Sequence, residues 1–434
     1  MKPIASPRFA LGVLLAVNLL NFFDRQLPGA LGEPIRREFG LSDTALGFLG
    51  TVFTLVYAAV GLPAGRLADR WLRTRVIALG VAAWSVLTAA SGLARTYSAL
   101  FVSRLGVGLG EAACAPAGQS LIGDLFPPQK RGRALAVFML GLPLGLCLAY
   151  FVSGHLGQAY GWRRVFLLAG LPGLAAALLA LLIAEPVRGA ADHGPAVLAP
   201  HPAPFRAVLS IPTMAWITLS GALHNFNVYA INSFQTPFLQ RFHQVSLRQA
   251  NTISALVLGA VGVVGLLVGG WAGDRLRARR PDGRLLLAAA ASFLATPCVL
   301  LALAQPKGAL RPFMLLMGAG STMMFVYYAT VYASIQDVVE PRLRGTAVAL
   351  YFFAMYVLGA SLGPVATGFL SDTFARRAMA AAGATAMAEP FKAAGLRDAM
   401  YVIPLLAFLA GLVLFAGARA IGADIRRREA AASL

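Results

Sequence analysis

The chain has 434 residues and is short of charge, because only 13% of its residues are Asp, Glu, Lys or Arg, against roughly a quarter in soluble domains. Acidic side chains are the scarcest, with 18 Asp and Glu against 37 Lys and Arg. Hydrophobic residues instead make up 58% of the chain. This composition excludes a soluble globular protein and predicts an all-α protein with many membrane-spanning helices.

Cysteine is also rare, and Cys114, Cys147 and Cys298 all lie in apolar runs at spacings that suit neither a disulfide nor a metal site. No hydrolase triad or metal-ligand spacing is present. The glycine run from Gly106 to Gly110 follows no strand and carries no phosphate-binding lysine, so it does not predict a nucleotide site. We therefore expect no enzymatic activity and no cofactor, and we interpret the glycines as positions of close helix approach.

The net charge of +19 does not predict a nucleic-acid partner, because the basic residues form short clusters between apolar segments. Lys and Arg are more numerous on the side of the membrane that holds the N-terminus. By the positive-inside rule both termini are then cytoplasmic.

At about 20 apolar residues per span, the sequence predicts twelve transmembrane helices. Their ranges are 9–32, 43–66, 74–94, 98–123, 133–158, 163–185, 211–240, 248–273, 284–304, 311–337, 344–371 and 398–422. A stretch rich in Pro, Ala and His, without apolar periodicity, separates the sixth from the seventh. The predicted organisation is an N-terminal six-helix bundle (1–185), a cytoplasmic linker (186–206) and a C-terminal six-helix bundle (207–434).

Two sequence matches support this division into halves. Residues 65–70 read GRLADR after the second span, and residues 270–275 read GWAGDR after the eighth. Asp124 and Arg131 follow the fourth span at the same spacing as Asp337 and Arg344 after the tenth. Such a parallel repeat predicts two bundles related by a pseudo-two-fold axis.

Full charges interrupt two of the spans. Arg104 and Glu111 are seven residues apart and so share one face of the fourth span, and Asp24 and Arg25 lie about two-thirds along the first. Charges at membrane depth are costly and usually face a polar path or a partner. We expect these four side chains to border a central chamber; the alternative is a static buried salt bridge.

Several motifs resemble the Major Facilitator Superfamily. The loop after the second span matches at Gly65, Asp69, Arg70, Arg73 and Arg75, although Leu72 replaces a frequent glycine, and the fourth span matches at Arg104, Gly108, Gly110 and Glu111. Within the superfamily the chain is most similar to the Spinster-like branch, through motifs that include NFFDR at 21–25, GEPI at 32–35, DLFPP at 124–128 and GWR at 161–163. The resemblance implies that Asp24 and Glu111 take up protons while Arg25 and Arg104 alternate between these carboxylates and an anionic headgroup.

The repeated charges beyond the spans suggest a cytoplasmic gate. Their acids would bind helix N-termini and basic loops in one state and release them in the other. The alternative is that these residues only set topology. The gate residues are Gly65, Asp69, Arg70, Arg73, Asp124, Arg131, Gly270, Asp274, Arg275, Asp337 and Arg344.

The seventh span carries polar residues on less than half of its circumference, which predicts a substrate-binding wall. Ordinary hydrogen bonds between helices are the alternative. The candidate substrate-binding residues are Asn18, Asn21, Arg104, His224, Asn225, Tyr229, Asn232, Gln235, Tyr327 and Phe352.

The sequence thus predicts a proton-coupled transporter with alternating access. The family resemblance suggests an amphipathic, lysolipid-like or sphingoid-like cargo; carriage of small organic anions, sugar acids or drugs is the alternative, and an uncoupled lipid scramblase is a third possibility. We expect a monomer in the bacterial inner membrane, in contact with membrane lipid and with no nucleic-acid partner.

Overall fold

The computed structural model describes residues 4, 6–188, 203–340 and 343–432, except for the side chains of residues 62, 64–69, 128–129, 132 and 429–432. The chain divides into two compact units. Unit 1 comprises residues 1–196, 235–240 and 245–255, and unit 2 comprises residues 197–234, 241–244 and 256–434.

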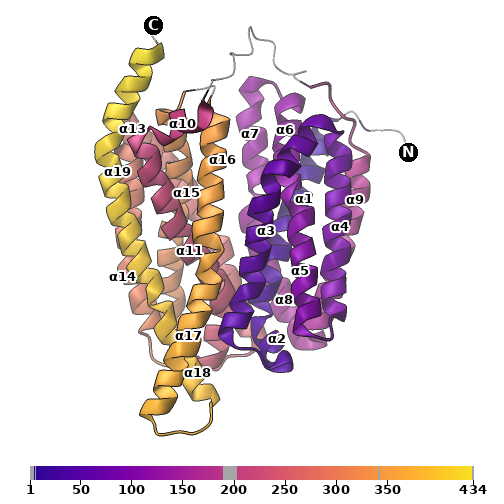
Figure 1. The fold of residues 1–434 in the computed structure, drawn as a ribbon, viewed down its shortest axis with the longest axis vertical. Helices are drawn as coiled ribbons and strands as arrows, with labels where there is room; N and C mark the ends of the chain where they lie inside the picture. The colour runs from indigo at the N-terminus through magenta and orange to yellow at the C-terminus, as the bar shows by residue number, and fades with distance from the viewer. Residues whose placement is uncertain (1–3, 5, 189–202, 341–342, 433–434) are drawn as a thin grey trace. The chain divides into compact units, whose positions relative to one another are not determined.

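Unit 1 is built of helices that run lengthwise through the bundle (Figure 1). They are α1 (Pro7–Ala30), α2 (Gly32–Phe39), α3 (Asp43–Arg70), α4 (Arg73–Leu93), α5 (Tyr97–Ala112), α6 (Cys114–Leu125), α7 (Pro128–Met139), α8 (Gly141–Tyr160), α9 (Trp162–Leu181) and α12 (Leu247–Ser254). Its apolar core is centred on Trp84, Val107 and Phe138, each less than 4% exposed.

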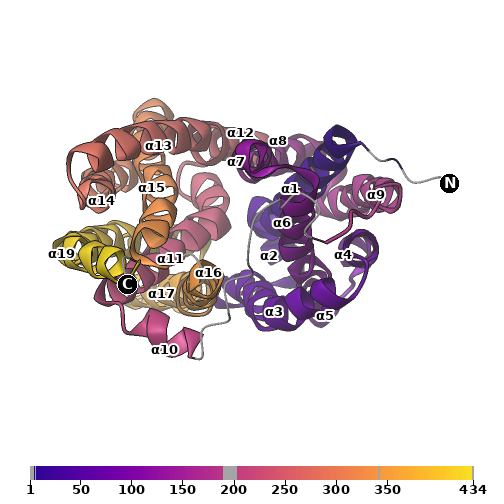
Figure 2. The same cartoon turned by 90° about the horizontal axis from the view of Figure 1, so that it is seen from above.

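The secondary-structure elements of unit 2 among its described residues are also helices. Its elements are α10 (Pro204–Leu209), most of α11 (Pro212–Arg241), the π-helix η1 (Ala255–Ala260), α13 (Val261–Arg279), α14 (Gly283–Leu303), α15 (Leu310–Val338), α16 (Arg344–Ala354), the π-helix η3 (Met355–Ala360), α17 (Leu362–Ala381), α18 (Glu389–Met400) and α19 (Val402–Ala432). Figure 2 shows α14 beside α19 at one edge of this unit, where the two helices pack against each other.

The predicted all-α membrane architecture is confirmed, and each of the twelve predicted spans corresponds to a helix or to consecutive helices. The fourth span breaks at Ala113 and the fifth at Leu140, and the eighth and eleventh contain the two π-helices. Among the described residues, ten helices are long and apolar enough to cross a membrane. Two predicted spans, α5–α6 and α11, are outside that group; the break at Ala113 leaves α5 with 16 residues and α6 with 12, each too short to cross alone.

Helix starts follow from local sequence. Ser6 caps α1 by accepting a hydrogen bond from the Phe9 amide at 3.3 Å, with Pro7 at the first helical position. Thr96 caps α5 in the same way through the Ala99 amide at 3.2 Å. These caps set where the charge-bearing helices α1 and α5 begin, and so set the depth of their charges.

Glycine allows α4 and α5 to approach closely. A Cβ atom on Gly80 would lie 2.7 Å from the Gly110 carbonyl oxygen, and a Cβ atom on Gly110 would lie 2.9 Å from the Gly80 carbonyl oxygen. The backbones are therefore in contact, as small residues permit in membrane bundles. This contact positions Glu111, the next residue along α5.

We expect Gly110→Ala to lower the melting temperature of the purified protein, because overpacking against backbone atoms costs about 1–3 kcal/mol. Gly12→Ala is the matched control, since a Cβ atom on Gly12 meets nothing within 4 Å and Ala favours the helix. Equal melting temperatures for the two variants would contradict the close contact.

Candidate functional site

The predicted intramembrane charges come together inside unit 1. The Arg25 guanidinium on α1 donates from Nε to Glu111 Oε2 on α5 at 2.9 Å. Arg104, also on α5, donates from Nη2 to the main-chain oxygen of Asp24 at 3.2 Å. We call Asp24, Arg25, Arg104 and Glu111 the charge cluster, and it joins α1 to α5.

The charge cluster is shielded from solvent in this conformation. The side chains of Arg25 and Glu111 are 3% and 0% exposed, and residues Asp24 and Arg104 are 3% and 1% exposed. The neighbouring helices of unit 1 therefore enclose these groups. That they border a central chamber stays a prediction.

The hydrogen bonds of the charge cluster are incomplete. Thr88 Oγ1 on α4 donates to Asp24 Oδ2 at 2.6 Å, but Asp24 Oδ1 and Glu111 Oε1 have no hydrogen-bond partner among the described residues. Arg104 Nε and Nη1 are unpartnered in the same sense. A purely structural salt bridge is expected to satisfy its buried atoms, so the spare donors and acceptors leave room for a proton or a ligand.

Aromatic rings surround the two guanidinium groups. Arg25 Cζ lies 4.1 Å from the ring centroid of Tyr57 and 5.3 Å from that of Phe53, and Arg104 Cζ lies 5.7 Å from that of Phe53. Cation–π attraction offsets part of the lost hydration of a buried cation. The two arginines can therefore remain charged beside the carboxylates.

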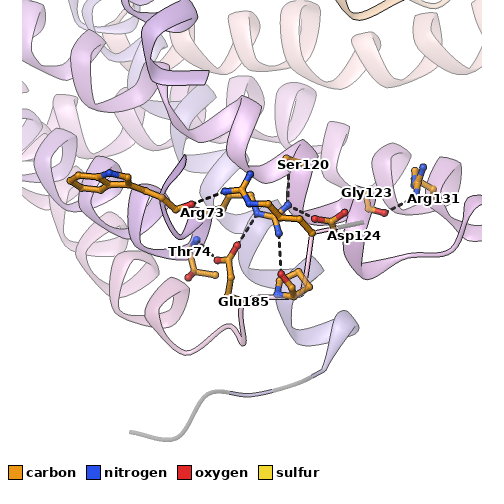
Figure 3. A network of polar contacts seen from close by, with 10 residues as sticks. Arg73, Thr74, Ser120, Gly123, Asp124, Arg131 and Glu185 are labelled. Carbon is orange, nitrogen blue, oxygen red and sulfur yellow. Dashed lines mark hydrogen bonds and ion pairs between the residues drawn. The ribbon is translucent and has the colours of Figure 1, made fainter. Parts of the chain in front are cut away.

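At the end of unit 1 that carries the N-terminus, Arg73 is the centre of a second network (Figure 3). Its guanidinium, only 1% exposed, pairs with Asp124 at the end of α6, and Nε donates to Glu185 Oε1 at 2.8 Å. Nη1 also donates to Ser120 Oγ at 2.9 Å, and Glu185 Oε2 accepts from the Thr74 amide at 3.0 Å. One arginine thus ties the start of α4 to α6 and to the segment after α9.

Unit 2 repeats this arrangement. Arg284, at the start of α14, donates from Nη1 to Asp337 near the end of α15 at 2.7 Å and from Nη2 to Asp274 at 2.6 Å. Arg277 Nε also reaches Asp337, at 3.2 Å. The pair Arg284–Asp337 therefore resembles Arg73–Asp124, since each pair joins the start of one helix to the end of another.

The repeated arginines Arg131 and Arg344 act on carbonyl groups. Arg131 Nη2 donates to the oxygen of Gly123 at 2.7 Å, and Arg344 Nη2 donates to the oxygen of Gln336 at 3.3 Å, in each case eight residues earlier. Each arginine therefore helps to cap the C-terminal end of the preceding helix. Asp124 binds Arg73, and Asp337 binds Arg277 and Arg284.

The other predicted gate residues vary in what they contact. The side chains at positions Gly65 and Asp69 lie outside the described residues. Arg70 is exposed, Arg275 lies 5.8 Å from the Trp271 ring, and a Cβ atom on Gly270 would meet nothing within 4 Å. Of the two motif acids, Asp69 and Asp274, only Asp274 has a described side chain, and it binds Arg284.

Aromatic side chains form a cluster inside unit 2. The His224 ring stacks on Tyr327 at a centroid distance of 3.9 Å and an interplanar angle of 11°, and meets the edge of Tyr328 at 4.9 Å. The Tyr327 hydroxyl bonds to the hydroxyls of Ser220 at 2.9 Å and Tyr351 at 3.2 Å. We call the rings of His224, Tyr229, Tyr327, Tyr328, Tyr332, Tyr351, Phe352 and Tyr356 the aromatic cluster.

Some predicted substrate residues are committed to bonds between helices. Asn18 Nδ2 donates to the Phe138 carbonyl oxygen at 2.8 Å, and Asn225 bonds to the Gly221 carbonyl and the Tyr328 hydroxyl at 2.9 and 3.2 Å. Gln235 Nε2 donates to Ser254 Oγ at 3.2 Å, and both residues belong to unit 1. Asn21 and Asn232 are 5% and 7% exposed.

The opposite end of unit 1 carries a charged contact that links α2 to α9. Trp162 Nε1 donates to Glu38 Oε2 at 2.6 Å, and Arg163 Nη2 donates to Glu38 Oε1 at 2.6 Å. Burial raises the pKa of Glu38. The hydrogen bonds from Arg163 and Trp162 and the charge of Arg163 lower it, and together they outweigh burial, so the pKa lies below its ordinary value of 4.5.

The lowered pKa of Glu38 predicts a pH-dependent contribution to stability. A group whose pKa is lowered by folding stabilises the folded state fully at pH values above its unfolded-state pKa of 4.5. This stabilisation disappears as the pH falls through the folded-state pKa. Because the side chain is 44% exposed, we expect less than about 1 kcal/mol. The melting-temperature difference between wild type and Glu38→Gln should be present at pH 7 and shrink toward pH 3; a difference that is constant with pH would contradict it.

A family model described as Major Facilitator Superfamily matches residues 14–364. The chain belongs to the Major Facilitator Superfamily. It is 33% identical over 365 residues to an MFS-type efflux pump of Mycolicibacterium smegmatis, with 84% of each chain covered. It is 27% identical to a sphingosine-1-phosphate transporter of Danio rerio, with 95% of this chain and 84% of the relative covered.

The solved structures give the same assignment. This superfamily member matches the crystal structure of a bacterial homologue of the human lysosomal transporter Spinster, in an inward-facing and unoccupied conformation, with a TM-score of 0.87. The two chains are 29% identical, and the match covers 96% of this chain and 98% of the other. The predicted Spinster-like character of the transporter is confirmed.

Some residues that organise the transporter's sites were not predicted from the sequence. Thr88 is one of several hydroxyl residues of α4. Such residues commonly bond to the backbone of their own helix, so no sequence pattern marks Thr88 as a partner of Asp24. Glu185 follows directly on the sixth span, and an acid there among basic residues is a usable signal. Arg284 lies at the start of α14 as Arg73 lies at the start of α4, but the sequence repeat does not align them, because Arg73 follows Asp69 by four residues and Arg284 follows Asp274 by ten.

Proposed function

We propose that this Spinster-like transporter is a proton-coupled secondary carrier that works by alternating access. The observation that carries the proposal is the burial of two carboxylates within spans. Among the described residues, five acids are less than 9% exposed, and three of them lie near helix ends or in the short helix α2. Of these five, Asp24 and Glu111 lie inside the predicted first and fourth spans, and each has an arginine beside it.

The proposed coupling step is exchange of partners within the charge cluster. Protonation of Glu111 removes its attraction for Arg25, and protonation of Asp24 does the same for Arg104. Each freed guanidinium can then bind an anionic group of the cargo. Because an isolated buried charge is costly, the proton and the cargo compete for the same arginines, which couples their movements.

The proposed cargo is an amphipathic lysolipid-like or sphingoid-like molecule. Arg25 and Arg104 supply cations for an anionic headgroup, and the rings of Tyr57 and Phe53 beside them suit an apolar chain. A small organic anion, sugar acid or drug is the second candidate. It is favoured by the unpartnered Nε and Nη1 of Arg104, which can bind a carboxylate directly, and by similarity to the mycobacterial efflux pump.

We further propose that the Arg73 network and its counterpart in unit 2 belong to a cytoplasmic gate, together with Asp69. In this proposal both termini face the cytoplasm of a bacterial cell, the carrier acts as a monomer in the inner membrane, and protons are its coupling ion. The two networks lie at matching places in the sequence repeat, which supports a shared role.

The test is a flux assay with purified protein in liposomes, using panels of lysolipids and of small organic acids, with and without a pH difference. Coupled carriage predicts accumulation of one class only when the pH gradient is present. Equilibration of lipid that is indifferent to the gradient would instead identify a scramblase. Uptake of organic acids without lysolipid movement would select the second candidate.

A further inference from the structure

A pocket of about 430 Å³ opens at the end of unit 1 that carries the N-terminus. One wall is the turn between α3 and α4, with Arg70, Trp71 and Arg75, and the other is the segment after α9, with Glu185 and Arg188. The pocket therefore lies beside the ends of three long helices, α3, α4 and α9. None of the predicted coupling or substrate residues lines it.

The lining of the pocket is strongly cationic. It holds three guanidinium groups and one carboxylate, and that carboxylate already accepts bonds from Arg73 and from the Thr74 amide. Arg70 and Arg75 are exposed and have no ion pair or hydrogen bond among the described residues. Two positive charges thus face the pocket without a described counter-ion.

Hydrogen bonds hold the two walls in place without a ligand. Arg188 Nη2 donates to the Trp71 carbonyl oxygen at 2.9 Å, and Arg73 Nη2 donates to the Pro186 carbonyl oxygen at 3.3 Å. Figure 3 shows the hydrogen bond between Arg73 and Glu185, which joins the same two segments. A preformed site costs less ordering on binding than a flexible one.

We propose that this pocket binds a phosphate-bearing anion, and that the phosphate belongs to the headgroup of an anionic membrane phospholipid. Guanidinium groups match the geometry and charge of a phosphate, and basic pockets at span ends on the cytoplasmic side bind anionic headgroups. Exposed apolar side chains beside the pocket favour lipid over soluble phosphate, since Trp71 is 57% exposed and Leu72 43% exposed. Tryptophan is typical of the membrane interface, where an acyl chain can lie along it.

Binding there would act on the Arg73 network. The headgroup would bridge the α3–α4 turn and the segment after α9, which Arg73 and Glu185 already connect. A ligand that binds only the connected arrangement stabilises it by mass action. The inference does not depend on the cargo or on proton coupling.

The test measures lipid retention by native mass spectrometry of the purified full-length protein, titrated with phosphatidylglycerol or phosphatidylethanolamine. We expect tighter binding of phosphatidylglycerol. Arg75→Gln should weaken it about 5-fold and Arg75→Gln with Arg188→Gln about 30-fold, as expected for loss of one or two basic residues near a membrane surface. Arg75 has no described structural partner, so the single variant tests the site even if the Arg188 variant loosens the turn.

The matched control replaces Arg419 and Arg426, two exposed arginines of α19 in unit 2. It removes the same charge and should retain wild-type affinity. Equal weakening in the control, or equal binding of the two lipids, would overturn the proposal. Inorganic phosphate at millimolar concentration is the second arm: if it binds as tightly as the lipid and depends equally on Arg75, the lipid assignment is wrong.

Discussion

Glu111→Gln is expected to reduce proton-driven uptake in proteoliposomes to the level of empty liposomes. Glutamine keeps the shape of the side chain and can still accept the hydrogen bond that Arg25 Nε donates at 2.9 Å, but it cannot take up a proton. Because the acceptor is preserved, the loss of stability should stay near 1–3 kcal/mol, less than for removal of a partner from a buried ion pair. Uptake with and without a pH gradient measures the effect.

Two controls separate coupling from folding. Glu111→Asp keeps a titratable carboxylate and should retain part of the gradient-driven uptake. Counterflow at equal pH on both sides should persist in Glu111→Gln, because exchange of cargo needs no net proton movement. Gradient-driven uptake that is unchanged in Glu111→Gln, at equal expression, would eliminate Glu111 as the coupling acid.

Arg73→Ala is expected to abolish transport and to lower the melting temperature strongly. The substitution removes a guanidinium that contacts Asp124, Glu185, Ser120 and the Pro186 carbonyl, and it leaves two half-buried carboxylates close together. Removal of one member of a buried charge network costs about 3 kcal/mol or more. Thermal unfolding of the detergent-solubilised protein and uptake in liposomes provide the two readouts.

Arg95→Ala is the matched control for Arg73→Ala. Arg95 lies just beyond the other end of α4, is exposed, and has no ion pair or hydrogen bond among the described residues. The free energy of unfolding of Arg95→Ala should lie within about 0.5 kcal/mol of the wild-type value, and the variant should transport normally. If Arg73→Ala behaved like this control, neither an anchoring nor a gating role for Arg73 would survive.

The spans were predictable because each is a long apolar run, and the charge cluster was predictable because each charged residue stands out in such a run. Twenty apolar residues in a row have few alternatives, and a charge such as Glu111 in such a run is conspicuous. Helical periodicity also correctly placed Arg104 and Glu111 on one face. Partners were harder to predict, because Thr88 and Arg25 meet their carboxylates through packing between helices far apart in sequence.

The internal repeat predicted matching positions for Asp124 and Asp337, but it did not predict the pairs that they form with Arg73, Arg277 and Arg284. These arginines lie about 50 to 60 residues earlier in the sequence, on other helices. Sequence spacing describes neighbours along a helix, whereas these pairs cross from one helix to another. The hydrogen bond between Gln235 and Ser254 also joins two helices, and spacing along α11 does not predict it.

Residues 235–240 and 245–255 lie beyond the linker in sequence, yet they belong to unit 1. Asn251 Nδ2 donates to the Ala30 carbonyl oxygen at 2.9 Å, and its Cβ atom lies 2.6 Å from where a Cβ atom on Gly154 would be. A gene split at the linker would therefore yield a first fragment with a bare groove along α8. That fragment should accumulate in membranes only when the second fragment is co-expressed to fill the groove.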